Sequence, residues 1–487
     1  MSFNSIDFLI FFPVVVIIYF IVPKRIRYIW LLIASYYFYM GWNPKYAILI
    51  AVSTVITYGT GLMIYKAQDF RLKKLWVALS LISNIGILVL FKYTDFLIDN
   101  FNKLSSYLGM SVVDRRMDLL LPVGISFYTF QALGYTFDVY KKDIVPEKNF
   151  LKYALYVSFF PQLVAGPIER SANLLPQIQN VENVQVWNFE RIRDGFLLMA
   201  WGFFQKLVIA DRASILVDNV INNYQGYGFL EISIAVVLFA VQIYCDFGGY
   251  TNIARGAAKV MGFTLMNNFR QPYLATNIKE FWRRWHISLT SWFTDYLYIP
   301  LGGSKKGLAR KYLNILIVFG VSGLWHGADW SFVTWGGVHA IYQILGDMKL
   351  RICQKYSITI FERNSFSTKL RGMTGTFILT DFAWIFFVCG GMHHSLAVIR
   401  QMFTVFQTTD VFELGLDRGN WFFLLFGIVI LTVVDVIHEN GMSVFAIMSR
   451  QELWFRWTIY LALIWTIIMF GIYGIAYDTS SFIYFQF

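Results

Sequence analysis

The sequence predicts an all-α protein that crosses a lipid bilayer many times. Of its 487 residues, 57% are hydrophobic and only 15% are charged, whereas about a quarter of the residues in soluble domains carry a charge. The 19% aromatic content is typical of proteins whose Trp and Tyr side chains line both membrane interfaces. A soluble globule cannot bury this much apolar surface, so we predict a polytopic membrane protein that forms one domain over residues 1–487.

The formal net charge of +11 suggests nucleic-acid binding until the positions of the basic residues are considered. They occupy short loops between apolar runs, which is typical of cytoplasmic loops that face anionic lipid. We therefore expect the lipid bilayer as a partner and no nucleic acid. The three cysteines show no CxxC spacing, so the sequence predicts neither a disulfide framework nor a metal site.

The N-terminal part predicts four membrane-crossing helices joined by short loops. The first run follows Asp7 rather than a basic segment, and no small-residue cleavage site comes after it, so we interpret it as an uncleaved span. The loops after the first and third runs are basic, and the positive-inside rule then places the N-terminus outside the cytoplasm. The four runs are Phe8–Val22, Tyr28–Trp42, Tyr46–Ile64 and Leu75–Phe91.

Beyond Phe91 the apolar pattern is interrupted by polar and helix-breaking residues. Residues 92–118 are mixed and are expected at the membrane interface. In residues 121–143, small and polar side chains such as Gln131 interrupt the apolar surface, as in helices that pack closely in a bundle. Two prolines and a glycine lie close together in residues 159–171. They predict a broken or re-entrant element, whose free backbone groups need protein or water around them.

The second half continues with apolar runs after one polar loop, residues 181–194, which we expect to be exposed. The run 230–244 ends in DFGGYTNIARGAAKVMGF, so Asp246 and Asn252 are expected close to an apolar wall. By the length that a span requires, the whole chain predicts roughly ten to twelve membrane-embedded helices. The other apolar runs in this half are residues 196–209, 331–345, 373–389, 421–437 and 454–475.

Residues 277–345 contain the two most informative histidines. In the first part, large apolar residues recur at spacings of three and four from Phe281 onward and predict one aromatic stripe on a helix at the membrane surface. Arg283 and Arg284 fall off that stripe, in the same segment as His286. This histidine is either a functional group or a hydrogen-bonded side chain of an interfacial anchor helix. The stripe comprises Phe281, Trp285, Leu289, Trp292 and Tyr296.

Of the two histidines, His326 is the stronger candidate for a functional role. Thirteen apolar-run residues, Leu313–Trp325, follow a basic loop, and at about 1.5 Å each they place His326 roughly 20 Å above it if the run is helical. That position is well inside a hydrocarbon core roughly 30 Å thick. An ionisable side chain at such a depth is a functional candidate by default. Gly323 and Gly327 flank the histidine, and we expect them to leave room for a substrate chain.

A neutral imidazole at that depth is suited to general-base chemistry. It can take the proton of a hydroxyl group that attacks an acyl group, and burial keeps it uncharged and available. The alternative is a structural histidine bonded to a neighbouring helix, which is our interpretation of His339. The acidic residues show no metal-ligand spacing, and we interpret each as a helix-to-helix hydrogen-bonding group. They are Asp246, Asp295, Asp329, Asp381 and Asp435.

Five motifs between Pro122 and Gly337 form a specific set. They are PVGISFYTFQ from Pro122, FFPQLVAGPIER from Phe159, DFGGYTNIARGAAKVMGF from Asp246, NFRQPYLATNIKEFWRRWHISLTSWFTDYLYIPLGG from Asn268 and GLWHGADWSFVTWGG from Gly323. This set resembles the membrane-bound O-acyltransferase (MBOAT) family, in particular its bacterial branch with the alginate O-acetylation proteins. The resemblance implies helices around a central tunnel, with His326 at its constriction and His286 at the second key position of the family.

The resemblance also implies a function, namely an acyltransferase of the bacterial inner membrane. It would pass an acetyl group from a cytoplasmic donor across the membrane for O-acetylation of an exported polysaccharide. His326 would be the general base, and His286 would assist it or hold the donor. The expected donor is acetyl-CoA, with no permanently bound cofactor, and the expected partners are the polysaccharide acceptor and a separate extracytoplasmic acetyltransferase protein. Candidate tunnel-lining residues are Trp325, Arg283, Arg284, Asp246, Asn252 and Gln131.

Two other functions remain open. D-alanyl transfer to teichoic acid from a carrier-protein thioester is the same type of reaction with another donor. A transporter without chemistry also carries embedded histidines, although the sequence lacks the paired repeats that many transporters show.

Overall fold

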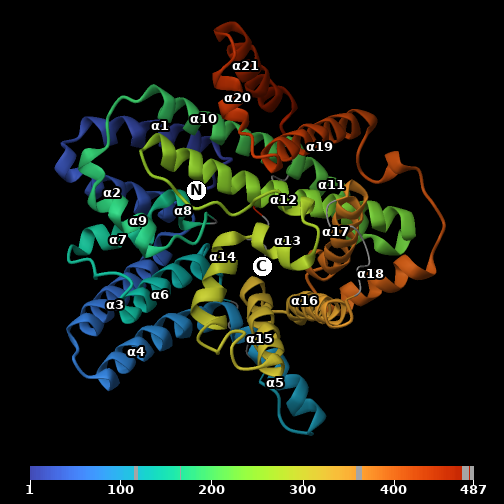
Figure 1. The fold of residues 1–487 in the computed structure, drawn as a ribbon, viewed down its shortest axis with the longest axis horizontal. Helices are drawn as coiled ribbons and strands as arrows, with labels where there is room; N and C mark the ends of the chain where they lie inside the picture. Colours follow the sequence, from blue (N-terminus) through green and yellow to red (C-terminus); the bar gives the residue numbers. More distant parts are fainter. Residues whose placement is uncertain (114–118, 165, 358–364, 474–481, 483–487) are drawn as a thin grey trace. The chain divides into compact units, whose positions relative to one another are not determined.

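The computed structural model describes residues 1–113, 119–164, 166–357, 365–473 and 482. These residues form α-helices with short 3-10 and π-helical segments, and no strand occurs among them (Figure 1). The predicted all-α class is therefore confirmed. The backbone separates into two compact units. The first comprises Met1–Met199 and Ile253–Met266, and the second comprises Ala200–Asn252 and Asn267–Phe487. A single domain over residues 1–487 stays a prediction.

The first unit contains the N-terminal helices, which follow the predicted apolar runs closely. The helices α2, α3, α4, α6 and α7 pack against one another within it. The elements are α1 (Ile6–Ile21), α2 (Arg27–Met40), α3 (Ala47–Lys66), α4 (Phe70–Leu88), α5 (Thr94–Tyr107), α6 (Ile125–Lys141), α7 (Phe150–Ser158), α8 (Phe160–Leu163), α9 (Ser171–Gln179) and the first part of α10 (Phe189–Phe203).

Three predicted connections in this unit can be compared with the structure. The break in residues 159–171 is confirmed, since only the short α8 separates α7 from α9; residue 165 lies outside the described part. The fourth run does not end at Phe91, because a π-helical turn carries the helix on into α5. Residues 114–118 of the interfacial segment are not described. The predicted loop over residues 181–194 extends too far, because α10 already begins at Phe189. The side chain of Asn188 caps this helix by accepting a hydrogen bond from the Arg191 backbone N–H (2.9 Å).

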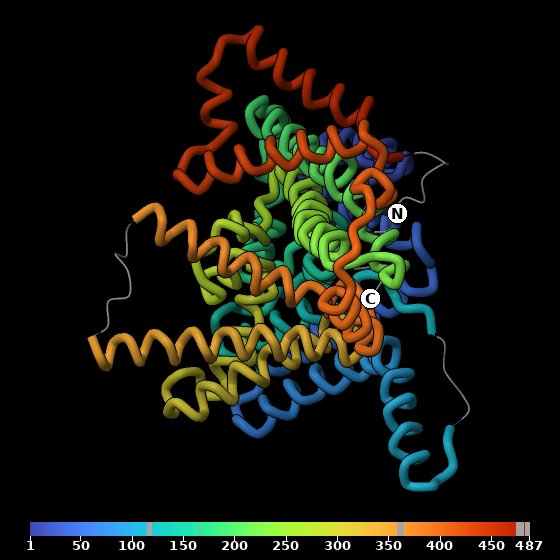
Figure 2. The backbone as a smooth tube through the Cα atoms, turned by 90° about the vertical axis from the view of Figure 1, so that its right-hand side faces the viewer, coloured from blue at the N-terminus to red at the C-terminus, as the bar shows by residue number. Residues whose placement is uncertain are grey.

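The second unit contains the long helices of the C-terminal half. In it, α15 packs along α16, and α16 packs against α17; Figure 2 shows the first two side by side. The elements are the π-helical segment η5 (Phe204–Ala210), α11 (Asp211–Asn222), most of α12 (Phe229–Val260), α13 (Ile278–Arg284), α14 (Ile287–Phe293), α15 (Leu308–His326), α16 (Trp330–Lys355), α17 (Phe366–Val388), α18 (Met392–Thr404), α19 (Arg418–Glu439), α20 (Val444–Ser449) and α21 (Leu453–Phe470).

Five helices in the described part of the chain are long and apolar enough to cross a membrane. The first helix, α1, is apolar but shorter. The total of ten to twelve embedded helices stays a prediction, as does a central tunnel, and residues 474–475 of the last predicted run lie outside the described part. The five are Pro44–Lys66, Phe70–Tyr107, Phe229–Val260, Arg418–Glu439 and Leu453–Phe470.

Glycines allow the backbones of α15 and α16 to come into direct contact. A Cβ atom added to Gly323 would lie 2.2 Å from the carbonyl oxygen of Phe332, and one added to Gly336 would lie 2.2 Å from that of Phe319. A Cβ on Gly327 would lie 2.2 Å from the Phe332 ring. The expectation that Gly323 and Gly327 leave room for a substrate chain is therefore wrong. Their missing side chains are instead needed for close helix packing.

Replacing Gly336 by alanine is expected to destabilise the protein by about 1–3 kcal/mol, because the added methyl group forces α15 and α16 apart. The adjacent Gly337 provides the matched control, since a Cβ there meets nothing within 4 Å. The midpoint of thermal unfolding in detergent should fall for Gly336→Ala and stay level or rise for Gly337→Ala. Equal midpoints for the two variants would contradict the packing argument.

Candidate active site

His286 lies at a sharp break between α13 and α14. Its φ of 44° and ψ of 53° are left-handed, a conformation that costs energy for a residue with a side chain and is often found at functional sites. A neighbouring segment holds the break on both sides. The Arg270 N–H donates to the Arg284 carbonyl oxygen (2.9 Å), and the Ile287 N–H donates to that of Asn268 (3.0 Å). The predicted single helix through this region is therefore wrong.

The aromatic stripe around His286 is buried inside the second unit. Phe281, Trp285 and Leu289 are each 1% exposed or less. The ring of Trp285 lies between those of Tyr273 and Trp384, with centres 5.9 and 5.2 Å away. The prediction of a helix at the membrane surface is wrong, because protein covers this face. A protein core and a lipid surface select the same periodic pattern, so the sequence did not distinguish them.

His326 is the last residue of α15, as the apolar run predicts, and it is 3% exposed. Trp335 of α16 and Phe387 of α17 pack edge-on against its imidazole, with ring centres 5.0 and 5.4 Å away. The predicted helix through residues 313–325 is confirmed, whereas the depth of His326 in the bilayer stays a prediction. Its position at a helix end, inside an aromatic shell, leaves the imidazole beyond the hydrogen-bonded helix backbone.

The structure brings the two predicted histidines together although they are far apart in the sequence. The ring centres of His286 and His326 are 6.2 Å apart, and His286 is completely buried. Trp325 lies beside both, at 5.8 Å from His286 and 4.9 Å from His326. Phe247 of α12 covers another edge of His286 at 4.7 Å. A small group placed between the two imidazoles would be within reach of both.

A cavity of about 1510 Å³ lies among α13 to α17. Its lining includes Leu289 and Thr290 of α14, which lie three and four residues after His286. It also includes Ser322 of α15, four residues before His326. Four residues make about one helical turn of 5.4 Å. Lining residues of the cavity therefore lie about one helical turn from each histidine.

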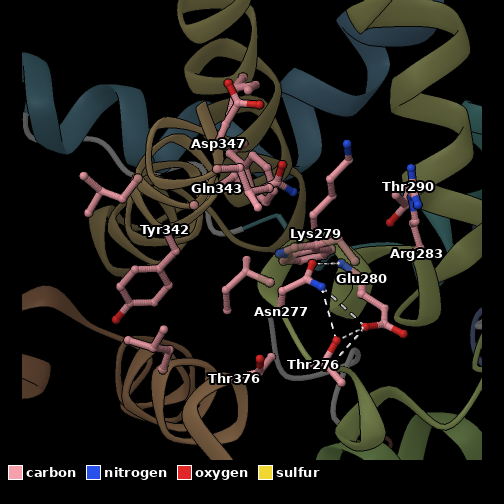
Figure 3. A pocket seen from close by; sticks show the side chains of 18 of the residues that line it. Thr276, Asn277, Lys279, Glu280, Arg283, Thr290, Tyr342, Gln343, Asp347 and Thr376 are labelled. Atoms are coloured by element: carbon pink, nitrogen blue, oxygen red, sulfur yellow. Dashed lines mark hydrogen bonds between the residues drawn. The ribbon is translucent and has the colours of Figure 1, made fainter. Parts of the chain in front are cut away.

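The lining of the cavity is rich in positive charge. Figure 3 shows Lys279 and Arg283 of α13 on one side, and Gln343 and Asp347 of α16 on another. Six basic and two acidic residues line it, and this excess of positive charge favours an anionic ligand. The basic residues are Lys279, Arg283, Lys311, Lys349, Lys369 and Arg371, and the acidic residues are Glu280 and Asp347.

Asp347 neutralises only part of this charge. Its carboxylate binds Lys311 at 2.6 Å and Arg351 at 2.8 Å, and it accepts a hydrogen bond from Tyr312 at 3.1 Å. Burial by itself would raise the pKa of Asp347, but these hydrogen bonds outweigh it and lower the pKa to about 2. Asp347 is therefore ionised across the physiological pH range and offsets the charge of Lys311.

Of the two predicted arginines, only Arg283 lines the cavity. Arg284 instead binds the carboxylates of Glu280 (2.5 Å) and Glu439 (2.6 Å), which ties α13 to the end of α19. Its charge is thus balanced twice, and its side chain has a structural role in this unit. A role for Arg283 towards a ligand stays a prediction that its position supports.

The other predicted tunnel residues take part in polar contacts within their own units. Asp246 forms an ion pair with Lys206 of η5 at 2.7 Å. The Asn252 amide donates to Gln205 at 2.8 Å. Gln131 lies in the first unit, where its amide donates to a backbone carbonyl oxygen of α7 at 2.5 Å. A tunnel-lining role for these three side chains stays a prediction.

Two of the remaining polar candidates, Asp435 and His339, form the helix-to-helix hydrogen bonds that the structural interpretation predicted, and one is an exception. For Asp295 and Asp381 this interpretation stays a prediction. The Tyr244 hydroxyl of α12 donates to Asp435 of α19 at 3.1 Å, a helix-to-helix bond. The indole N–H of Trp282 in α13 donates to Nδ1 of His339 in α16 at 3.3 Å. Asp329 is the exception, because it caps its own helix by accepting from the Ser331 backbone N–H.

The sequence reasoning missed two kinds of residue at the site. Lys349 follows the apolar run 331–345, and Lys369 precedes the next run, 373–389. The positive-inside rule places both lysines on the cytoplasmic side, and this shared location could have indicated them. The aromatic residues between the cavity and His326, namely Trp282 and Trp335, gave no separate signal. They belong to apolar patterns that fit an ordinary core equally well.

The apolar helices define an integral membrane protein, and its second unit holds a basic cavity near two buried histidines. A sequence model described as "MBOAT, membrane-bound O-acyltransferase family" matches residues 143–388. The chain belongs to this family, which confirms the resemblance seen in its motifs. It is therefore an O-acyltransferase and an integral protein of the bacterial inner membrane.

Curated relatives show what the chain is similar to. A peptidoglycan O-acetyltransferase of Helicobacter pylori is 35% identical over 399 residues, which are 77% of this chain and 73% of the relative. A probable alginate O-acetylase of Pseudomonas aeruginosa is 34% identical over 436 residues, 88% of this chain and 80% of the relative. A teichoic acid D-alanyltransferase of Bacillus subtilis is 27% identical over 240 residues, 46% of this chain and 58% of the relative.

Proposed function

We propose that this O-acyltransferase takes an acetyl group from a cytoplasmic thioester and passes it outward for O-acetylation of a cell-surface polysaccharide. The observation that carries the proposal is the basic cavity whose lining includes residues about one helical turn from each of two buried histidines. A cavity of that charge suits an anionic donor, and the histidines supply proton-transfer groups where its acyl end would arrive.

The donor that fits best is acetyl-CoA. Its phosphates match the lysines and arginines of the lining, and its pantetheine arm and acetyl group match apolar lining residues such as Leu289 and Phe319. The cavity also reaches Ser304 and Lys311, beside the basic residues Lys305 and Lys306. The positive-inside rule assigns such a segment to the cytoplasm, where acetyl-CoA is made. The same rule places the N-terminus on the outer side.

The proposed reaction uses His326 as the general base. Its imidazole takes the proton of an acceptor hydroxyl group while the hydroxyl oxygen forms a bond to the acetyl carbonyl carbon. The carbon–sulfur bond of the thioester then breaks, and the thiolate receives the proton that His326 accepted. His286, with its ring centre 6.2 Å from that of His326, is positioned to hold the acetyl group or to assist proton transfer.

The acceptor that we propose is a cell-surface polysaccharide. The names of two relatives specify acetyl transfer to peptidoglycan and to alginate, which supports a polysaccharide acceptor for this chain. We further propose that a separate extracytoplasmic acetyltransferase protein completes the transfer. Its hydroxyl nucleophile would then be the immediate acceptor at His326.

D-alanyl transfer is the second candidate, because teichoic acid D-alanyltransferases are among the relatives. They are less similar than the acetylating relatives and align over less than half of this chain. A carrier-protein donor would present one phosphopantetheine arm with a single phosphate. That arm would leave most of the six basic side chains of the cavity without a partner in the complex.

The test of the proposal is transfer by the purified protein in lipid vesicles. Labelled acetyl-CoA is supplied at the cytoplasmic face, with alginate or peptidoglycan at the other face, alone or with extracytoplasmic membrane proteins from the same organism. Label in the polymer supports the proposal. Transfer from a D-alanyl carrier protein, with none from acetyl-CoA, would replace it by the second candidate.

Reversing two charges of the cavity is expected to weaken donor binding. The double variant Lys349→Glu/Lys369→Glu should raise the KM for acetyl-CoA about tenfold or more with little change in kcat, because two attractive contacts become repulsive ones. Lys305→Glu/Lys306→Glu makes the same change of net charge outside the lining. An equal rise of KM in both double variants would show long-range steering alone and contradict a binding role for the cavity lysines.

A further inference from the structure

Trp282 stands between the cavity and His326. Its side chain is 6% exposed, and it lines the cavity wall together with Phe319. Its other edge packs against Trp335 at 5.6 Å between ring centres. Trp335 does not line the cavity and packs against His326 at 5.0 Å. An acyl group that passes from the cavity to His326 along this line of contacts meets the pair of indoles first.

His339 holds the Trp282 indole in place. The indole N–H can only donate, so Nδ1 of His339 accepts at 3.3 Å and the neutral imidazole carries its hydrogen on Nε2. His339 is completely buried and contacts Trp282 edge-on at 5.0 Å and Trp335 at 5.2 Å. Its ring is parallel to that of Phe281, at 6.3 Å. These contacts fix the rotamer of Trp282.

We propose that Trp282, locked by His339, is the wall that limits the acyl group to two carbons. The inference rests on the proposed acetyl transfer from a thioester in the cavity. Trp282 would be the specificity-determining residue, and His339 a positioning residue that acts through it. A longer acyl chain would have to displace an indole that is hydrogen-bonded to His339 and packed against Phe319 and Trp335, whereas an acetyl group would not.

The size of the expected selectivity follows from general experience with apolar pockets. One methylene group more or less changes kcat/KM by roughly 10- to 200-fold when the pocket is rigid. Propionyl and butyryl donors should therefore be progressively poorer substrates of the native protein. A pocket wall that moves freely would not give this progression. The hydrogen bond to His339 is therefore needed to keep the Trp282 indole in place.

The experiment compares acetyl-, propionyl- and butyryl-CoA as donors for the full chain in vesicles, with the ratio of butyryl to acetyl transfer as the readout. Trp282→Ala should raise this ratio tenfold or more. His339→Leu removes the acceptor of the indole N–H and should also raise it, by a smaller factor. His339→Asn places an amide oxygen near the position of Nδ1 and should restore the native ratio. A purely structural histidine would lower all three rates together.

Trp292→Ala is the matched control, because Trp292 is 7% exposed, lies on the next helix and does not line the cavity. The ratio of butyryl to acetyl transfer by this variant should equal that of the native protein. An unchanged ratio in an active Trp282→Ala would overturn the proposal. If Trp282→Ala is inactive with every donor, the ratio of butyryl to acetyl transfer is measured for Trp282→Phe instead. This variant keeps an aromatic ring but loses the N–H group, and an unchanged ratio would again overturn the proposal. Failure of the native protein with all three donors would instead reject the proposed acetyl transfer itself.

Discussion

Replacing His326 by alanine is expected to reduce acyl transfer by about 10²–10⁴-fold, the range that general acid–base groups contribute. The imidazole is 3% exposed and lies within an aromatic shell formed by Trp325, Trp335 and Phe387. No water-accessible group can easily replace it as a proton acceptor in such surroundings. The loss should appear in kcat, because the cavity that would bind the donor lies a helical turn away and keeps its charges.

The matched control for this variant is His393→Ala, which removes an exposed histidine from α18 in the same unit. It should keep the native rate. His326→Ala should also unfold at a temperature close to that of the native protein and retain its KM for acetyl-CoA. A variant that is stable, binds the donor and still transfers at the native rate would leave His326 as a structural histidine.

The His286→Ala variant separates two roles for the second histidine. If His286 assists the same proton transfer, the double variant with His326→Ala should be hardly slower than His326→Ala alone, because groups that act as a unit are not additive. If it only holds the acyl donor, its loss should raise KM independently. The 6.2 Å between the ring centres makes either role possible, so kinetics must decide.

Much of the fold followed from the sequence because lipid imposes a simple rule on composition. Apolar runs that need to satisfy their own backbone groups form helices, and the observed bounds of α1, α3 and α19 are within a few residues of the predicted ones. The two histidines were also identifiable, since an ionisable side chain inside an apolar run is costly and hence informative.

The break at His286 could not be read from the sequence. The aromatic period continues across it, and neither glycine nor proline marks the left-handed turn. The hydrogen bonds that hold the turn come from Asn268 and Arg270, so the break depends on a neighbouring segment. The same holds for Gly323, because only the packing of α16 shows that the space beside this glycine is filled by the backbone of Phe332.

Replacing Lys206 by methionine is expected to destabilise the protein more than any other change considered, by about 3–5 kcal/mol. Its ammonium group lies 2.8 Å from Asp211 and 2.7 Å from Asp246, and the three side chains are only 4–7% exposed. Methionine has a similar size but leaves two carboxylates together in an apolar surrounding. Asp246→Asn should be far milder, because Lys206 and Asp211 would still form a neutral pair.

An exposed ion pair provides the contrast. Lys259 binds Asp194 at 3.2 Å with side chains that are 41% and 21% exposed, and such a pair contributes only about 0.2–1 kcal/mol. The unfolding midpoint in detergent should therefore fall steeply for Lys206→Met and hardly at all for Lys259→Met. The double variant Lys206→Met/Asp246→Asn should regain part of the loss, because one of the two uncompensated charges is gone.

The same variant tests how the buried charges relate to the site. Asp246 precedes Phe247, whose ring covers His286 at 4.7 Å, so the ion pair with Lys206 fixes the part of α12 that positions this histidine. In the protein that remains folded, Lys206→Met should lower kcat while the KM for acetyl-CoA stays close to native, because the cavity lies on α13 to α17. A stable, fully active Lys206→Met protein would contradict both the energetic argument and the positioning argument.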